Sequence, residues 1–161
     1  MCIFSACGQI VFGSVMGLCL IFTAVATFDG RMLSWDCLNH EFQCSPWQHA
    51  QRDYMITVAV FLCLAIVFQL IALIWNFVTF CACCCKKYII HPLVGLSFVV
   101  TVFLFIAVIV YVASQGEANE FITYRNHVYD YSFWLAVCAL ILAAIDTIVA
   151  GMTVCLGERG L

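Results

Sequence analysis

Apolar residues gather in four long stretches along the chain, and polar residues gather between them. Each stretch approaches or exceeds the roughly 20 residues that a helix needs to cross about 30 Å of hydrocarbon, so the pattern predicts four transmembrane helices. The predicted spans are residues 8–28, 54–80, 93–113 and 132–154. The predicted loops and tail are residues 29–53, 81–92, 114–131 and 155–161. An even number of spans places both termini on the same side of the membrane.

The composition supports a membrane protein with a single four-helix domain. Of the 161 residues, 66% are hydrophobic and 9% are charged, which excludes an ordinary soluble domain. The first span lacks a basic segment before it and a small-residue cleavage site after it, so we expect a retained helix rather than a signal peptide. The net charge of -3 is scattered, which gives no indication of a nucleic-acid surface.

The cysteines and two lysines predict how the chain is threaded. Lys86 and Lys87 lie between the second and third spans, and the positive-inside rule makes that turn cytoplasmic, although three basic residues fall on each side. A dense cysteine cluster precedes the lysines, whereas loop 29–53 holds only Cys37 and Cys44. Disulfides persist outside the cytosol, so this contrast also indicates cytoplasmic termini.

The cysteine cluster before Lys86 has three readings. Its members, so closely spaced, fit poorly around one zinc ion, which is usually bound by two separated cysteine pairs. Cysteines beside basic residues at a cytoplasmic helix end are typical of S-acylation, which we favour. Small apolar residues that fill a helix end are the third reading. The candidate S-acylation sites are Cys81, Cys83, Cys84, Cys85, Cys2 and Cys7.

The two outer loops predict a small docking surface. Cys37 and Cys44 have a spacing that a hairpin of strands 32–35 and 41–44 closes with a disulfide; a metal site with His40 is the less favoured reading. In the second loop, Phe121, Ile122 and Tyr124 lie among polar residues. Some of these aromatics fit an interfacial belt, and an extended segment at Phe121 and Ile122 would add an edge strand and dock a partner.

Three polar side chains are expected inside the membrane. Asp146 lies deep in the fourth span, in ILAAIDTIVAG, and Gln69 and Asn76 lie in the second. A buried carboxyl group must be neutralised, hydrogen-bonded or able to reach the surface, and Asn76 is the predicted partner. Helix-to-helix hydrogen bonding is favoured over a proton or ion relay, which needs more ionisable groups in series.

Several of these features together resemble the superfamily of claudins, peripheral myelin proteins and epithelial membrane proteins. They are Trp35 with Cys37 and Cys44, Arg52 in AQRDYMIT at the second span, and YDYSFWLAVCALIL at the fourth. The first loop is shorter than in claudins, and LSWDC replaces their longer motif. The resemblance implies an all-α membrane protein, a left-handed four-helix bundle with a small extracellular antiparallel β-sheet stapled by Cys37 and Cys44.

The sequence favours a non-catalytic role. No catalytic, phosphate-binding or metal signature occurs, so we expect no enzyme activity, cofactor or small-molecule substrate. The resemblance implies adhesion, junction or membrane organisation at cell contacts in the plasma membrane. The alternative is an auxiliary subunit of an ion channel or receptor. The expected partners are membrane lipids and either further copies of the protein, in cis or trans, or a larger channel or receptor complex.

Overall fold

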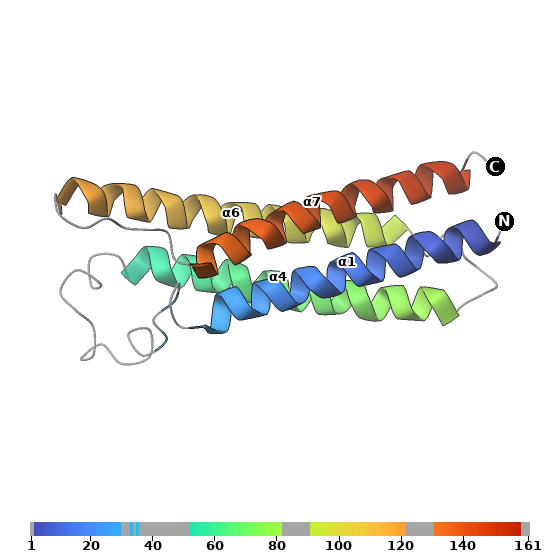
Figure 1. Cartoon of the computed structure of the whole chain (residues 1–161), viewed down its shortest axis with the longest axis horizontal. Helices are drawn as coiled ribbons and strands as arrows, with labels where there is room; N and C mark the ends of the chain where they lie inside the picture. Colours follow the sequence, from blue (N-terminus) through green and yellow to red (C-terminus); the bar gives the residue numbers. More distant parts are fainter. Residues whose placement is uncertain are drawn as a thin grey trace.

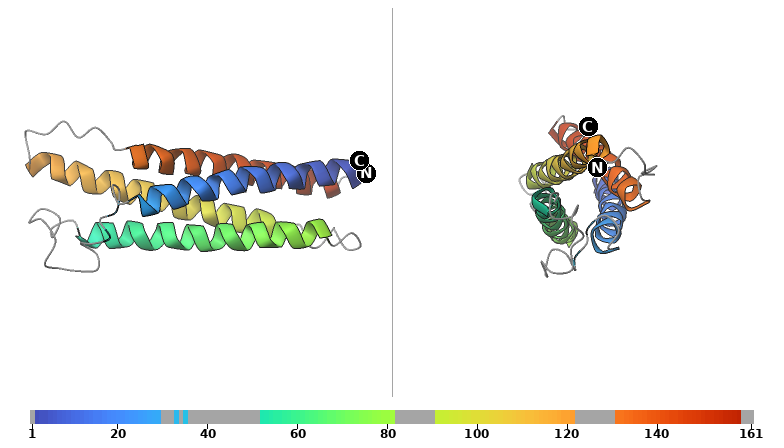
Figure 2. Two further views of the ribbon diagram at one scale, coloured as in Figure 1. Left: turned by 60° about the horizontal axis from the view of Figure 1, so that its bottom comes forward. Right: turned by 90° about the vertical axis from the view of Figure 1, so that its left-hand side faces the viewer.

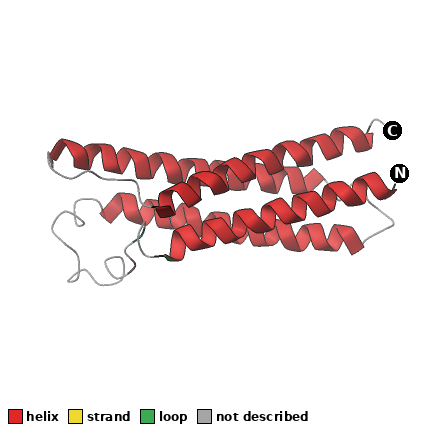
Figure 3. Cartoon of the chain, in the orientation of Figure 1, coloured by secondary structure: helices red, strands yellow, loops and turns green. Residues whose placement is uncertain are grey.

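The computed structural model of the protein describes residues 2–29, 33, 35, 52–81, 91–121 and 131–158. Four long helices contain nearly all of these residues (Figure 1 and Figure 3). They are α1 (Cys2–Phe28), α4 (Arg52–Cys81), α6 (His91–Phe121) and α7 (Tyr131–Glu158). Segments long and apolar enough to cross a membrane lie at Gly8–Phe28, Arg52–Thr79, Pro92–Ser114 and Tyr131–Met152. The chain is therefore a multi-pass membrane protein.

The four helices form an elongated bundle in which successive helices run in opposite directions (Figure 1 and Figure 2). Helix α1 packs against α4 and α7, and α6 packs against the same two helices, so α4 and α7 face each other across the diagonal. We call the end where α1 stops and α4 begins the outer end, and the opposite end, where α1 begins and α7 stops, the inner end.

The buried positions of each helix repeat every three and four residues. This alternation averages 3.5 residues and is the spacing that left-handed packing produces. The buried stripe of α1 is Phe12, Met16, Cys19, Thr23 and Ala26. The stripe of α4 is Val58, Leu62, Ala65, Gln69 and Ala72, and that of α6 is Leu93, Ser97, Val100, Leu104 and Ala107. The stripe of α7 is Ser132, Ala136, Ala139, Ala143, Asp146 and Ala150.

Small and polar side chains fill the interior, and large apolar side chains cover the outside. Four of the six stripe residues of α7 are alanines, whereas Ile141, Ile145 and Ile148 of the same helix are exposed. Lipid tails solvate isoleucine as well as a protein core does, so close approach of small residues holds membrane helices together better than apolar burial. The distribution fits a bundle surrounded by lipid.

Aromatic pairs join the helices from the middle of the bundle to its outer end. Phe103 of α6 contacts two phenylalanines of α4, with ring centroids 5.9 Å from Phe61 and 5.5 Å from Phe68. Tyr111 of α6 stacks on Phe133 of α7 at 5.5 Å. Because centroid distances of 4.5 to 7 Å are favourable for aromatic rings, these contacts fix α6 against both of its neighbours.

Helix α6 is longer than its predicted span and changes the expectation for the second outer loop. Its 31 residues extend about 46 Å, more than the hydrocarbon thickness, and it reaches beyond the start of α7 (Figure 1). The extended conformation predicted for Phe121 is wrong, because this residue ends α6. The good helix formers Gln115, Glu117 and Ala118 let the helix continue past the apolar segment.

The predicted β-sheet is not among the described elements. Residues 41–44 and Ile122 lie outside the described part of the chain, and of the strand predicted at 32–35 only Leu33 and Trp35 are described. The sheet therefore stays a prediction, and the structure shows the coarser architecture, a four-helix membrane bundle.

Candidate functional site

Trp35 closes the outer end of α1. Its indole Nε1 donates a hydrogen bond to the carbonyl oxygen of Thr27 at 2.9 Å, and its ring stacks on Phe28 with centroids 6.0 Å apart. The last carbonyl groups of a helix have no partner within the helix, so the indole satisfies an acceptor that needs one. The tryptophan of the family motif thus holds the start of the first outer loop against the bundle.

Two further contacts tie this loop start to the rest of the outer end. Leu33 is fully buried and packs in the same core cluster as Ala26 of α1 and Val58 of α4. Ser132, at the start of α7, donates a hydrogen bond to Asp29 Oδ2 at 3.0 Å. We call Phe28, Asp29, Leu33, Trp35 and Ser132 the outer rim. The rim fixes the place from which loop 29–53 leaves the bundle.

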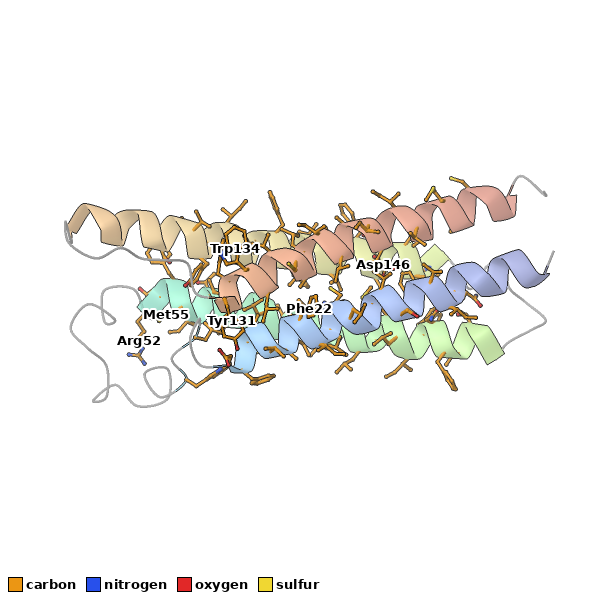
Figure 4. The ribbon with its side chains drawn as sticks, in the orientation of Figure 1. Phe22, Arg52, Met55, Tyr131, Trp134 and Asp146 are labelled. Carbon is orange, nitrogen blue, oxygen red and sulfur yellow. The ribbon has the colours of Figure 1, made fainter. Side chains whose placement is uncertain are left out.

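Arg52 is the first residue of α4 and lies at the outer end of the bundle (Figure 4). It is half-buried, and Met55 one turn further into α4 is half-buried as well. An arginine that begins a membrane helix keeps its charge near the interface while its alkyl part covers apolar surface. The motif residues Trp35 and Arg52 therefore lie at the same end of the bundle, on the two sides of the first loop.

The interior contains a polar contact between three helices. Gln69 of α4 donates its Nε2 group to Cys19 Sγ and to Thr23 Oγ1 of α1, each at 3.1 Å. The thiol of Cys19 in turn donates to the carbonyl oxygen of Ala139 in α7 at 3.2 Å. Gln69 is fully buried. These bonds connect α4, α1 and α7 at one level.

A second polar group joins α6 to α7. The hydroxyl of Thr147 lies 3.0 Å from that of Ser97 and 3.1 Å from that of Thr101. Thr101 and Thr147 also donate to the carbonyl oxygens of Ser97 and Ala143, four residues earlier in their own helices. Hydroxyl groups that remain bonded to their own helix and also contact a neighbour add interhelical attraction without leaving a polar atom unsatisfied.

Asn76 joins α4 to α1 and not to Asp146. Its Nδ2 donates to the carbonyl oxygen of Gln9 at 3.2 Å. A Cβ atom placed on Gly13 would lie 2.8 Å from the same nitrogen, so the absence of a side chain at Gly13 lets the amide reach α1. The predicted pairing of Asn76 with Asp146 is wrong, because α4 and α7 are diagonal to each other.

Asp146 is fully buried on the interior stripe of α7 (Figure 4). It lies one turn from Ala143 of one core cluster and one turn from Ala150 of the other, so it separates the two apolar parts of the core. Among the described residues neither carboxylate oxygen has a hydrogen-bond partner. The sequence leaves open whether this acid is neutralised, hydrogen-bonded or able to reach the surface, and the structure places its side chain inside the bundle.

The predicted cysteine sites are only partly described. Cys2 and Cys7 lie near the start of α1 and Cys81 ends α4, so all three positions are at the inner end. Cys37, Cys44, Cys83, Cys84 and Cys85 lie outside the described residues, as does Tyr124 of the predicted docking surface. In the described part of the chain no three His, Cys, Asp or Glu residues are grouped to hold a metal ion.

Sequence reasoning missed the helix partners of the intramembrane polar residues. Cys19, Thr23, Ser97 and Thr101 supply those contacts and do not stand out individually in apolar spans. Three of them can be found from the spacing of the buried positions, which alternates between three and four residues. This spacing places Cys19 and Thr23 on the buried stripe of α1 and Ser97 on the buried stripe of α6.

The fold and the outer rim define a class of membrane protein, a four-helix bundle that holds its first loop through a tryptophan at the outer end. The model of the family described as "Tight junction protein, Claudin-like" matches residues 1–156. The chain belongs to this claudin-like family, which confirms the resemblance found in the sequence. No curated protein and no solved structure matches the chain.

Proposed function

We propose that this protein has a non-catalytic structural role at cell contacts, where it organises adhesion or junctions in the plasma membrane. The observation that carries the proposal is the claudin-like family match over residues 1–156. The outer rim supports it, because Trp35 and Asp29 fix both the exit of the first loop and the start of α7. Loops held in this way present a constant surface to a neighbouring membrane.

The proposal includes an orientation, with both termini in the cytoplasm and the outer rim facing the neighbouring cell. The inner end holds the start of α1 and the end of α7 (Figure 1). Lys86 and Lys87 follow α4 at that end and favour the cytoplasmic side. The candidate docking residues Phe121, Ile122 and Tyr124 then lie outside the cell, at and after the end of α6.

Enrichment at cell contacts tests this role and the rim together. In cells that lack adhesion proteins of their own, tagged protein will concentrate where two expressing cells meet, but not where an expressing cell meets a non-expressing one. Replacing Trp35 by Phe keeps the stacking on Phe28 and removes the indole hydrogen bond. Loss of about 1 kcal/mol from the rim, roughly fivefold in the ratio of its closed to its open form, will reduce the enrichment at equal surface amount.

The matched control is Trp134→Phe. Trp134 is exposed at the start of α7 and contacts Phe133 by ring edge only. The Trp134→Phe variant will leave the enrichment at cell contacts unchanged. Equal enrichment at both kinds of contact, measured by fluorescence for the native protein, would refute adhesion in trans.

The alternative function, an auxiliary subunit of a channel or receptor, gives a different result on purification. If the protein organises cell contacts, purification in mild detergent will recover only oligomers of the protein itself. An unrelated channel or receptor recovered at a fixed ratio would replace the present proposal by the alternative. Mass spectrometry of the material purified from native cells measures the ratio.

S-acylation at the inner end is a further expected property. Serine at Cys81, Cys83, Cys84 and Cys85 together will abolish the hydroxylamine-sensitive lipid label and reduce surface clustering, because the acyl chains hold the turn after α4 in the inner leaflet. The control is Cys138→Ser, which removes an exposed thiol of α7 far from the inner end. A label that is unchanged in the fourfold variant would contradict the assignment.

A further inference from the structure

The carboxyl group of Asp146 is enclosed in the bundle, and the described residues place no basic side chain in the interior beside it. Its exposed fraction is 0%, and in the described part of the chain neither of its oxygens has a hydrogen-bond partner. It lies about 21 Å from Ser132 along α7 at 1.5 Å per residue, well inside the hydrocarbon. The basic residues of the described helices stand at helix ends, Arg52 at the outer end and His91 at the inner end.

The described side chains that line the interior on the three other helices supply no charge to balance Asp146. On α1 the ionisable side chain of the buried stripe is the thiol of Cys19, whose hydrogen is directed to the carbonyl oxygen of Ala139 in α7. On α6 the stripe positions nearest in level are Ser97 and Val100, and the Ser97 hydroxyl contacts Thr147. Across the diagonal, the α4 stripe from Ala65 to Ala72 carries the amide of Gln69 and no ionisable group.

The other unpartnered polar atoms show an excess of acceptors. In the described core, Gln69 Oε1, Asn76 Oδ1 and Gln9 Oε1 have no donor, and Gln9 Nε2 is the only unpartnered amide nitrogen among them. Together with the two oxygens of Asp146, five unpartnered oxygen atoms stand against one unpartnered amide nitrogen. A buried acceptor needs a donor, and an isolated carboxylate in a medium of low dielectric is neutralised in preference to staying charged.

Gln9 and Asn76 lie between Asp146 and the inner end. Gln9 is about 10 Å from the start of α1, whereas Asp146 is about 18 Å from the end of α7, at 1.5 Å per residue. Asn76 meets α1 at Gln9, where both amides retain unpartnered atoms. Apolar core lies on both sides of Asp146. Toward the inner end the cluster of Phe12, Met16, Ala72, Leu93 and Ala150 separates it from these amides, and toward the outer end Leu62, Leu104 and Ala136 are fully buried.

We propose that Asp146 is an intramembrane proton-binding site that exchanges with water from the inner end. In the folded bundle the carboxyl group carries a proton that a hydronium ion delivers from the water at the inner end: one O–H bond of the hydronium breaks and leaves a water molecule, an O–H bond forms on Asp146, and the negative charge is removed. The amides of Gln9 and Asn76 hydrogen-bond the water that brings the proton. This site is separate from the role at cell contacts and does not depend on it.

Infrared spectroscopy of the purified protein in lipid nanodiscs tests the site. At neutral pH the native protein will show the carbonyl stretch of a protonated aspartic acid, and the band will shift in heavy water. The band will be lost in Asp146→Asn, the neutral isostere, and retained in Asp29→Asn, which makes the same change at an exposed aspartate of the outer rim. A band that survives Asp146→Asn would overturn the proposal.

Isotope labelling gives the same answer without a variant, should Asp146→Asn fail to fold. Aspartate labelled with carbon-13 at the side-chain carboxyl will shift the protonated band of the native protein, because Asp146 is the only aspartate inside the predicted spans. Absence of any protonated, label-sensitive band at neutral pH would show an ionised carboxylate and refute the proposal.

Gln9→Leu tests the inner route. The hydrogen bond of Asn76 goes to the backbone oxygen of Gln9, so this variant keeps it while removing both side-chain amide atoms. Exchange of the Asp146 proton for deuterium will slow at least tenfold. Ser14→Ala is the control, because the Ser14 hydroxyl is exposed and bonded within α1. Equal exchange rates in Gln9→Leu and the native protein would overturn the inner route.

Discussion

Replacing Cys37 or Cys44 by serine will keep most of the protein from the cell surface. If the two cysteines form the predicted disulfide, its loss costs about 2 to 5 kcal/mol, the range for native disulfides in small extracellular domains. The outer rim adds only individual contacts, such as the hydrogen bonds of Trp35 and Ser132, each worth about 1 kcal/mol. The rim therefore cannot compensate, and surface biotinylation will show the loss.

The double variant decides whether the two cysteines act as a pair. Replacing either cysteine removes the whole disulfide. The variants Cys37→Ser and Cys44→Ser and the double variant will therefore have the same amount of protein at the cell surface. Cys63→Ser, at a free half-buried thiol within α4, is the control and will retain normal export. Additive losses in the double variant, or both thiols found free in non-reduced peptides at the surface, would contradict the disulfide and the proposed topology.

The helices and their burial follow from the sequence because the membrane imposes a simple rule. A chain without water around it must satisfy its backbone within helices, so long apolar stretches predict the spans closely. The alternating stripe that ends with Ala143, Asp146 and Ala150 also lies in the sequence, in small residues three and four apart. Hydropathy alone misses this stripe, because alanine and isoleucine are both apolar while only alanine is inside.

The order of the helices around the bundle does not follow from the sequence. The sequence predicts similar depths for Asp146 and Asn76, and depth alone made them a pair. The bundle places α4 diagonal to α7, and Asn76 is directed to α1 instead. Which helices are neighbours depends on how the surfaces of all four helices pack together, and the sequence of one span does not determine this.

The extramembrane part is harder to predict because local and tertiary preferences compete there. Residues 114–121 are polar, which suggests a loop, yet they continue α6 to Phe121. Trp35 is recognisable from the family motif, but its bond to the Thr27 carbonyl depends on the chain turning back over the end of α1. The motif predicted that Trp35 matters, and the structure shows the helix end as its partner.

Replacing Gly13 by leucine will separate α1 from α4 and destabilise the bundle by about 1 to 3 kcal/mol, the usual cost of overpacking. A single added Cβ already lies 2.8 Å from Asn76 Nδ2, and a leucine side chain extends further into the same space. Asn76 must then leave Gln9, with loss of an intramembrane hydrogen bond worth about 0.6 kcal/mol on average. Thermal unfolding in detergent, followed by circular dichroism, will show a lower midpoint.

Gly17→Leu is the matched control, one helical turn along the same helix. No neighbouring atom lies within 4 Å of a Cβ added there, so leucine enters open space and gains up to about 1 kcal/mol of helix propensity over glycine. Gly13→Ala separates the cost of overpacking from the cost of losing the hydrogen bond. The amide of Asn76 can rotate away from a single methyl group, and the gain in helix propensity then offsets the lost hydrogen bond to Gln9. A midpoint lowered as much by Gly17→Leu as by Gly13→Leu would show a general intolerance of α1 to bulk and would contradict the contact at Asn76.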